Sequence, residues 1–301
     1  MIEWKTPDID FIKANRGVCG GCRRFGSDTA PANIFLLGEK YGTKVAVLNG
    51  AMLRYYNGYA PNRRGYGFPL FRGEADLRAI TDALRRDADE RGVPFGFCLC
   101  DEKQKTALDS VLKTDWSFTD DDSDYIYKRE SLAALAGKKL HRKRNHISGF
   151  NRLYDDAEYR PLTPDNAADA YKVAELWLAE REGHGSEDER AELVSIRAAL
   201  GNMEALGLLG GVLYVGGVPA AMTVASQISD CVTDVHYEKS FGEYAANGAF
   251  TVINQCFASS GQSESEYFNR EEDMGIEGLK TAKESYFPSF KLKKYYGVCR
   301  C

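Results

Sequence analysis

The sequence predicts an α+β protein with α/β/α layers, in which two units each hold a mixed, mostly antiparallel sheet flanked by helices. Two observations support this fold class. Runs rich in Val, Ile, Leu and Tyr alternate with segments whose apolar residues recur at helical spacing. Both halves of the 301-residue chain also repeat one order of elements: a meander of strands, a helix, a short strand, a helix and a final strand. We therefore expect a first unit at 1–130, a connecting helical region at 131–157 and a second unit at 158–301.

The elements of the first half follow from turn residues and apolar periodicity. We expect strands at 33–38, 43–49, 52–57, 65–72, 95–100 and 125–129. We expect helices at 7–15, 74–91, 101–112 and 131–136. The helix at 74–91 has the clearest pattern, because Leu77, Ile80 and Leu84 share one face and Gly92 ends it.

In the second half, two helix starts are marked by capping residues. Thr163 precedes Pro164, and Ser186 precedes Glu189 by three residues, which is the spacing of a capping box. The predicted helices cover 163–182, 186–200, 247–260 and 276–286. The predicted strands cover 159–162, 207–215, 218–226, 230–239, 266–269 and 290–298.

Composition excludes several classes of protein. A formal net charge of −5 argues against a protein that coats duplex DNA. The stretch 205–229 has no charged residue, but its V-G-G-V turn predicts two buried strands instead of a transmembrane segment. The first residues lack the apolar core of a signal peptide, so we expect a cytoplasmic protein with reduced thiols. Cys19 and Cys22 could form half a zinc site, but no second pair completes it, and free thiols are the preferred interpretation.

The densest basic run lies at 137–154, between the two predicted units. On a helical wheel Lys143 falls inside an apolar stripe, Lys139 and His146 lie at its edge, and Arg144 adds a further cation. One interpretation is a surface helix whose lysine stem snorkels to water. The other is an anion-binding helix that lines a crevice between the two units, because Lys and Arg match phosphate groups.

Two further stretches contain candidate catalytic residues. On the strand at 230–239, Asp234, His236 and Glu238 share one face, where a histidine beside carboxylates could act as an acid or base. The alternative is an exposed network of ions at the strand end. The stretch from Asn269 through Arg270 and Glu271 to Asp273 follows a short strand, which is a usual place for a site, or else it caps the next helix. Lys283 and Tyr286 lie on that helix.

A meander followed by a β-α-β unit is the element order of the GNAT acyltransferase fold. Most GNAT enzymes that use acyl-CoA cradle its pyrophosphate on an Arg/Gln-x-x-Gly-x-Gly/Ala loop. The corresponding stretch here, F-G-E-Y-A-A-N-G-A at 241–249, has two glycines, no Arg and an acidic residue. Ordinary acyl-CoA binding is therefore not expected.

Four stretches resemble an uncharacterised bacterial family related to the C-terminal domain of phosphatidylglycerol lysyltransferases. They read K-K-L-H-R-K-R-N-H-I (138–147), V-H-Y-E-K (235–239), N-G-A-F-T-V-I-N-Q (247–255) and N-R-E-E-D-M-G-I-E-G-L-K-T-A-K-E-S-Y-F-P (269–288). Ser27-Asp28 and Ala32-Asn33 are similar to its N-terminal region. The resemblance implies two tandem GNAT-like domains. It also implies aminoacyl transfer from aminoacyl-tRNA to an acceptor, while the membrane domain of better-known relatives has no counterpart here.

These observations together predict an acyltransferase that transfers an aminoacyl or acyl group to an amine or hydroxyl acceptor. The expected catalytic residues are His236, Glu238 and Glu271. The expected residues of the donor and substrate site are Lys139, Lys143, Arg144, His146, Asp234, Asn247, Asn254, Asn269, Arg270, Lys283 and Tyr286. We expect no metal and no required cofactor, with aminoacyl-tRNA favoured over acyl-CoA as co-substrate. The alternative is a non-catalytic GNAT pair that binds a nucleotide, a tRNA end or a peptide.

Overall fold

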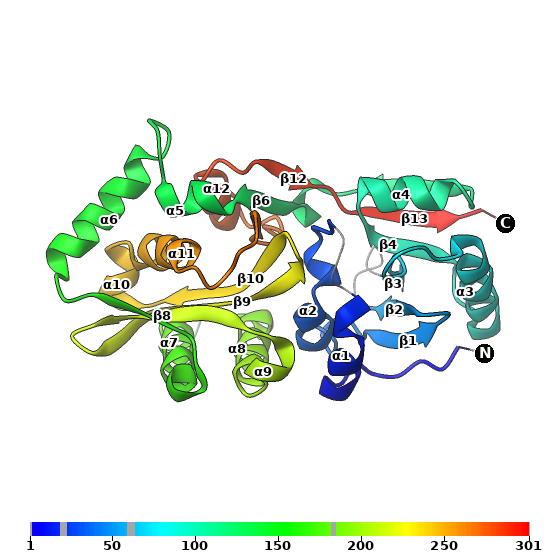
Figure 1. Ribbon diagram of the computed structural model, residues 1–301, viewed down its shortest axis with the longest axis horizontal. Coiled ribbons are helices and arrows are strands. Elements are labelled where there is room, and N and C mark those ends of the chain that lie inside the picture. Colours follow the sequence, from blue (N-terminus) through cyan, green and yellow to red (C-terminus); the bar gives the residue numbers. More distant parts are fainter. Residues whose placement is uncertain (1, 19–22, 59–63, 182–184, 301) are drawn as a thin grey trace.

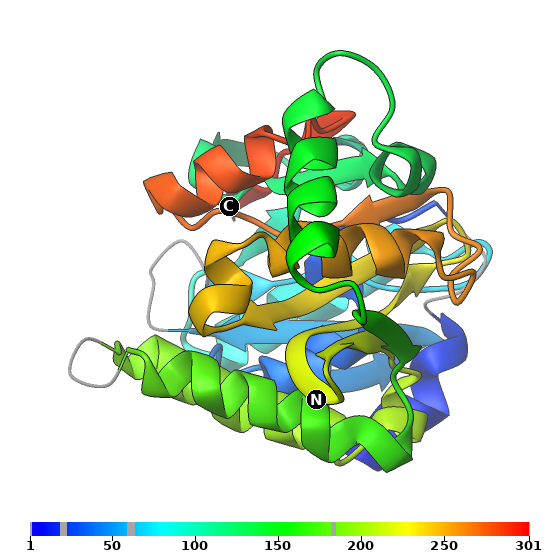
Figure 2. The ribbon, with the colours of Figure 1, turned by 90° about the vertical axis from the view of Figure 1, so that its left-hand side faces the viewer.

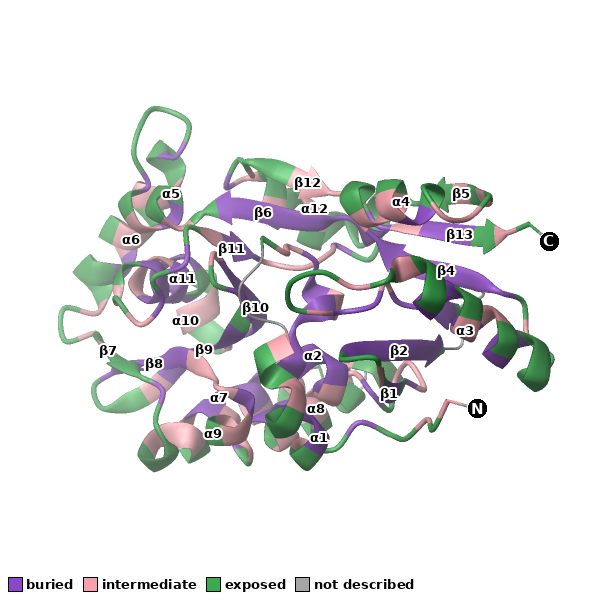
Figure 3. Cartoon of the chain, turned by 45° about the vertical axis from the view of Figure 1, so that its right-hand side comes forward, coloured by how far each residue is buried: buried purple, intermediate pink, exposed green. Residues whose placement is uncertain are grey.

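The protein is built around two β-sheets that lie side by side (Figure 1). The computed structural model describes residues 2–18, 23–58, 64–181 and 185–300. Helices cover both sheets, and strands β2 (Ala51–Asn57), β4 (Gly96–Cys100) and β6 (Asp124–Lys128) are buried along most of their length (Figure 3). This arrangement confirms the predicted α+β class with mostly antiparallel sheets flanked by helices.

The first sheet has the strand order β1-β2-β3-β4-β13-β5. Its strands are β1 (Lys44–Leu48), β2 (Ala51–Asn57), β3 (Arg64–Tyr66), β4 (Gly96–Cys100), β13 (Tyr295–Cys299) and β5 (Thr114–Phe118). All pairs are antiparallel except β3 with β4.

The second sheet has the order β12-β6-β11-β10-β9-β8-β7. Its strands are β12 (Phe290–Leu292), β6 (Asp124–Lys128), β11 (Tyr267–Asn269), β10 (Val232–Ser240), β9 (Val218–Ser229), β8 (Leu209–Val215) and β7 (Glu158–Pro161). The pair β10 and β11 is parallel, whereas its other pairs are antiparallel. The V-G-G-V turn joins β8 to β9, and Val215 pairs with Val218, which confirms the predicted hairpin.

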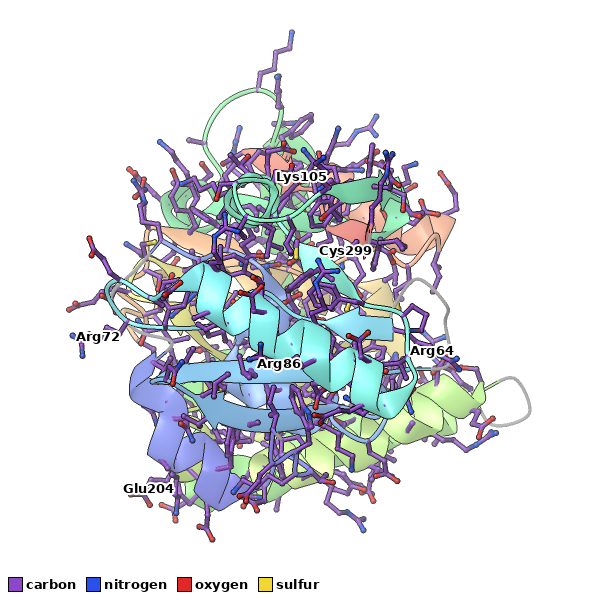
Figure 4. All side chains as sticks on the ribbon, turned by 90° about the vertical axis from the view of Figure 1, so that its right-hand side faces the viewer. Arg64, Arg72, Arg86, Lys105, Glu204 and Cys299 are labelled. Atoms are coloured by element: carbon purple, nitrogen blue, oxygen red, sulfur yellow. The ribbon has the colours of Figure 1, made fainter. Side chains whose placement is uncertain are left out.

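The helices of the first half lie around the first sheet and at its junction with the second, except for the last of them. They are α1 (Ile9–Asn15), α2 (Pro31–Leu36), α3 (Leu77–Arg91), α4 (Glu102–Asp109) and α5 (Arg129–Ala134). Helix α5 packs against α11 (Ala249–Ser259) on the second sheet (Figure 1). Helix α3 packs Ile80, Leu84 and Ala88 on the first sheet, while Arg86 lies on its outer side (Figure 4). Helix α2 lies between the sheets and contacts β9 and α8 of the second half (Figure 1).

The helices of the second half cover both faces of the second sheet. They are α6 (His141–Leu153), α7 (Ala167–Ala179), α8 (Glu187–Leu200), α9 (Met203–Leu206), α10 (Gly242–Ala246), α11 (Ala249–Ser259) and α12 (Glu277–Glu284). Val212 and Tyr214 pack in the core beneath α7, whereas the alternate residues Leu213 and Val215 pack with α11 on the other face. The predicted capping box forms at Ser186, and Thr163, the predicted N-cap, forms a second one with Asn166. In the described residues, no helix combines the length and apolarity needed to cross a membrane.

Two sequence predictions of strands were wrong. The stretch 33–38 forms helix α2, because Pro31 occupies its first turn and pre-sets the helical backbone angle. The stretch 290–298 is not one strand, since β12 belongs to the second sheet and β13 to the first. The predicted strand at 65–72 is confined to β3 and one bridge from Leu70 to Met52, and strand β5 was not predicted.

The two sheets do not follow the two halves of the chain. The chain leaves the first sheet after β5 and enters the second at β6, and it returns at the end between β12 and β13 (Figure 1). The boundaries at 130 and 158 stay a prediction. The second sheet is formed by one continuous segment from β6 to β12, whereas the first combines β1 to β5 with the C-terminal strand β13.

One buried ion pair joins the two crossings. Lys294, between β12 and β13, lies against Asp124, the first residue of β6, and also against Glu272 at 3.3 Å. Burial by itself lowers the pKa of Lys294, but the charges of Asp124 and Glu272 outweigh it and hold that pKa well above its ordinary value. Lys294 also donates to Ser27 Oγ at 2.9 Å, so the N-terminal segment joins the same cluster.

We predict that Lys294→Met lowers the free energy of unfolding by about 3–5 kcal/mol, because it leaves the fully buried Asp124 without its counter-ion. Lys291→Met is the matched control, since Lys291 pairs with Asp120 and Glu284, which are about half exposed, and should cost at most about 1 kcal/mol. Urea unfolding of both variants measures the difference. Equal losses would show that the crossing ion pair contributes nothing special.

Candidate functional site

The candidate site lies where strands β10 and β11 separate. The two strands pair only from Val232 with Tyr267 to Asp234 with Asn269. Beyond this point β10 continues to Ser240 along β9 alone, while the chain after Asn269 turns away. Glu271 sits in this turn with a φ of 56°, in the left-handed region. We call the space between the separating strands the wedge, and side chains from both strands converge there.

At the closed end of the wedge, three titratable side chains meet. His236 Nδ1 lies 3.5 Å from Asp234 Oδ2 and 3.4 Å from Glu271 Oε1, and its Nε2 is 2.8 Å from Ser226 Oγ. From helix α2, the side-chain amide of Asn33 donates to Asp234 at 3.0 Å and to Glu271 at 2.9 Å. Both halves of the chain therefore contribute to this group, which we call the acidic cluster.

The two carboxylates of the acidic cluster differ in burial, so only one of them can contact an incoming molecule. Asp234 is fully buried, and its Oδ1 has no hydrogen-bond partner among the described residues. Burial, and then the negative charge of Glu271, raises the pKa of Asp234 well above its ordinary range. The side chain of Glu271 is 25% exposed, so it is the carboxylate that an incoming molecule can reach.

A second group lies further along the wedge. Glu238 forms an ion pair with Arg270 and accepts a hydrogen bond from Asn254 at 3.1 Å. The guanidinium of Arg270 also lies 5.0 Å from the ring centre of Tyr286. Arg270 Nη1 and Asn254 Oδ1 are buried without a hydrogen-bond partner among the described residues. One orphaned donor and one orphaned acceptor thus remain available to a bound molecule.

Lys143 of helix α6 contacts this second group through the ring of Tyr286. Its Nζ lies 3.8 Å from the ring centre of Tyr286, and the lysine is half-buried. Burial, with a smaller contribution from the charge of Arg270, lowers the pKa of Lys143 to about 8. Helix α6 lies at the end of the second sheet remote from the first sheet, so it does not line a crevice between the two sheets (Figure 1). Lys143 is therefore a half-buried cation beside the second group, and not at the predicted crevice between the two units.

Two predicted site residues position the turn that carries Glu271. Asn269 Oδ1 accepts from the backbone N–H of Glu271 at 2.7 Å, while its amide donates to Asp124 at 2.8 Å. Lys283 of α12 donates to the backbone carbonyls of Glu271 and Glu272. These contacts hold the left-handed turn, so Asn269 and Lys283 act through Glu271.

Four predicted residues make contacts outside these groups. Arg144 donates to two backbone carbonyls in the segment before α6, and Asn247 donates to a tyrosine hydroxyl at the end of α6. Lys139 is exposed, with its Nζ 5.3 Å from the ring centre of Phe287, and His146 is exposed. Arg144 and Asn247 were predicted to bind the donor, but in the structure their side chains form hydrogen bonds within the protein.

Two site residues were missed by the sequence predictions of catalytic groups. Asn33 lies in the stretch that was predicted as a strand, and Ser226 lies in an apolar strand. Two signals pointed to Asn33: it is a polar residue within the apolar run P-A-N-I-F-L, where a buried amide needs partners, and Ala32-Asn33 is part of the family resemblance. Its partners come from the other half of the chain, at sequence separations of 201 and 238 residues.

Three side chains of the acidic cluster are close enough together to bind one metal ion. Ligand atoms of Asp234, His236 and Glu271 lie within 4.8 Å of one another. The amide of Asn33 already donates to both carboxylates, however, so hydrogen bonds account for the arrangement. The candidate zinc ligands Cys19 and Cys22 lie outside the described residues.

The loop that corresponds to the CoA-binding loop is largely helical. Residues 242–246 form α10, and Asn247 and Gly248 donate their backbone N–H groups to carbonyls within this turn. The backbone N–H groups of Asn247 and Gly248 are therefore already hydrogen-bonded within this turn.

Known structures with this fold span nearly the whole chain. A conserved protein of unknown function from Bacteroides thetaiotaomicron is 32% identical, with a TM-score of 0.91 and coverage of 100% of both chains. L-PGS from Bacillus licheniformis is 14% identical, with a TM-score of 0.66 and coverage of 98% of this chain and 92% of that one. A tandem GNAT protein from the clavulanic acid biosynthesis pathway is 11% identical, with a TM-score of 0.50 and coverage of 99% and 98%.

These likenesses confirm the expected GNAT-like, acyltransferase-like fold. Among curated proteins, none matches this chain. The profile of one family, described as phosphatidylglycerol lysyltransferase, C-terminal, matches residues 21–297. Because this match covers nearly the whole sequence, the chain belongs to the family of the phosphatidylglycerol lysyltransferase C-terminal domain.

Proposed function

We propose that this protein transfers an aminoacyl group from an aminoacyl-tRNA-type donor to an amine or hydroxyl acceptor. The observation that carries the proposal is the wedge, where the reachable carboxylate Glu271 and the orphaned donor Arg270 Nη1 come from one turn. A base and a hydrogen-bond donor on either side of a carbonyl are what acyl transfer needs.

The reaction follows from these positions. The acceptor N–H or O–H attacks the carbonyl carbon of the donor ester, and its proton passes to the carboxylate of Glu271. The guanidinium of Arg270 stabilises the negative charge that develops on the carbonyl oxygen. The ester C–O bond then breaks, and the leaving ribose oxygen takes up the proton. Glu238 and Asn254 orient Arg270, so in this proposal Glu238 is a positioning residue and not a base.

Two features favour an aminoacyl-tRNA-type donor over acyl-CoA. The acidic cluster of Asp234, His236 and Glu271 would attract the ammonium group of an amino acid. Lys143 and Arg270 would attract a phosphate of the donor. The backbone amides that would bind the CoA pyrophosphate are partly used within α10.

One observation favours the alternative, a GNAT pair that binds a nucleotide, a tRNA end or a peptide without catalysis. The glycine loop at 241–249 lacks the Arg of acyl-CoA enzymes. Transfer and binding must therefore be measured separately. Lysyl-tRNA that binds the wild-type protein in the wedge without any turnover would favour the binding protein.

Glu271→Gln should reduce transfer of labelled lysine from lysyl-tRNA to phosphatidylglycerol vesicles by about 10²–10⁴-fold, because the amide cannot accept the proton. The Kd for lysyl-tRNA should rise far less than turnover falls, since the amide keeps the shape of the side chain and loses only its attraction for the ammonium group of the donor. Glu264→Gln, in an exposed position six residues before Arg270, is the control and should keep wild-type turnover. Full activity in Glu271→Gln would remove Glu271 from the proposed reaction.

The Kd for lysyl-tRNA should rise about tenfold between pH 7 and pH 9, because a lysine with a pKa of about 8 loses most of its charge there. Lys143→Arg keeps its charge across this range, so its affinity should be nearly independent of pH. Fluorescence anisotropy at constant ionic strength measures both proteins. Parallel pH profiles of the wild-type and Lys143→Arg proteins would show that Lys143 does not contact the donor.

A further inference from the structure

A cavity lies at the C-terminal end of strand β10, beyond the side chains of the wedge. It has a volume of about 230 Å³ and is lined from helices α7, α10 and α11 and from the end of β10. We call it the β10 pocket. Sites for whole drug-sized molecules measure about 300–1,000 Å³, so this one has room for part of a larger ligand. Its lining residues are Trp177, Glu180, Arg181, Ser240, Ala245 and Phe250.

Two elements connect the second group of the wedge to the β10 pocket. On β10, Ser240 follows Glu238 by two residues. On α11, Phe250 precedes Asn254 by four residues, which is about one turn. Each step is about 6–7 Å long and keeps its two side chains on one face. Glu238 and Asn254 hold Arg270, so the pocket adjoins the guanidinium that stabilises the reacting carbonyl in the proposed reaction.

The walls of the β10 pocket combine an open aromatic ring with a free carboxylate. Phe250 is 38% exposed, so a flat ring can stack on it. Trp177 already packs against two cations, because Lys239 Nζ lies 3.7 Å and the guanidinium of Arg181 4.8 Å from its ring centre. Glu180 has no ion-pair partner among the described residues, so its carboxylate can accept hydrogen bonds from a ligand.

Helix α6 brings Lys143 to the same end of the second sheet. The Cβ of His146 lies 3.4 Å from where a side chain on Gly248 would begin, so α6 packs on the start of α11. Figure 2 looks at this end of the molecule and shows α6 lying across α11. Lys143 precedes His146 by one turn and contacts Tyr286. An open ring, a guanidinium and a half-buried lysine therefore surround the start of α11.

We propose that the β10 pocket binds the adenine base at the 3′ end of the donor, an inference that rests on the proposed function. The base stacks on Phe250, and its exocyclic amino group donates to the carboxylate of Glu180. A ribose separates its base from a 3′-ester by about the length of one helical turn, so the ester carbonyl reaches Arg270 while the base stays in the pocket. The phosphate of this nucleotide then faces Lys143.

Fluorescence anisotropy of an RNA hexamer labelled at its 5′ end tests this inference without any turnover. The wild-type protein should bind a hexamer that ends in C-C-A about fivefold more tightly than one that ends in C-C-U, because uracil presents a carbonyl oxygen to Glu180. Phe250→Ala should raise the Kd for the C-C-A hexamer about tenfold, since the stacked ring is lost. Glu180→Leu should abolish the preference for adenine over uracil.

Phe118→Ala is the matched control, because it removes a ring that is 45% exposed on the first sheet, and it should bind as the wild type does. Melting temperatures verify that every variant folds. The inference is overturned if the wild-type protein binds both hexamers equally or if Phe118→Ala loses as much affinity as Phe250→Ala. It is also overturned if coenzyme A, which carries adenine as well, displaces the hexamer with a lower Kd than the unlabelled hexamer does.

These outcomes are separate from those of the proposed reaction. Adenine-specific binding by a protein that never transfers lysine would overturn the reaction and leave the β10 pocket as a nucleoside site. Transfer of lysine from lysyl-tRNA that Phe250→Ala leaves unchanged, in both kcat and KM, would overturn the pocket and leave the reaction.

Discussion

The structure depends on the buried ion pair between Lys294 and Asp124. Each residue stands where the chain passes from one sheet to the other, so the pair fastens two crossings at once. Burial raises the pKa of Asp124 to about 6, and the charge of Lys294 opposes that shift. Neither charge would tolerate this position alone, because an isolated buried charge is far more costly than a paired one. The pair therefore stabilises the return of the C-terminal strand β13 to the first sheet.

The ion pair also reaches the candidate site through one side chain. Asp124 accepts from the amide of Asn269, and Asn269 accepts from the backbone N–H of Glu271. Glu271 has a backbone conformation that side-chain-bearing residues rarely adopt, and this chain of hydrogen bonds, with Lys283, holds it there. The position of the reachable carboxylate is thus set by contacts that link both halves of the protein.

The wedge has two electrostatic ends. Asp234 and Glu271 gather negative charge at the closed end, and Arg270 and Lys143 gather positive charge further along β10. Glu238 lies between them and neutralises part of the charge of Arg270. A molecule that carries an ammonium group and a phosphate on either side of a carbonyl would match both ends. The separation of the strands creates this arrangement, because paired strands would leave no room between them.

The sequence alone determined what depends on local patterns. Alternation placed Asp234, His236 and Glu238 on one face, turn and capping residues located most strands and helices, and the wheel identified Lys143 as an unusual cation. Tertiary structure decided which strands share a sheet and that 33–38 is a helix. It also decided that Asn33 contacts Asp234 and that Ser226 contacts His236. The reason is physical. Hydrogen bonds between residues about 200 positions apart depend on how the elements pack, and the local spacing of apolar and polar residues does not identify such distant partners.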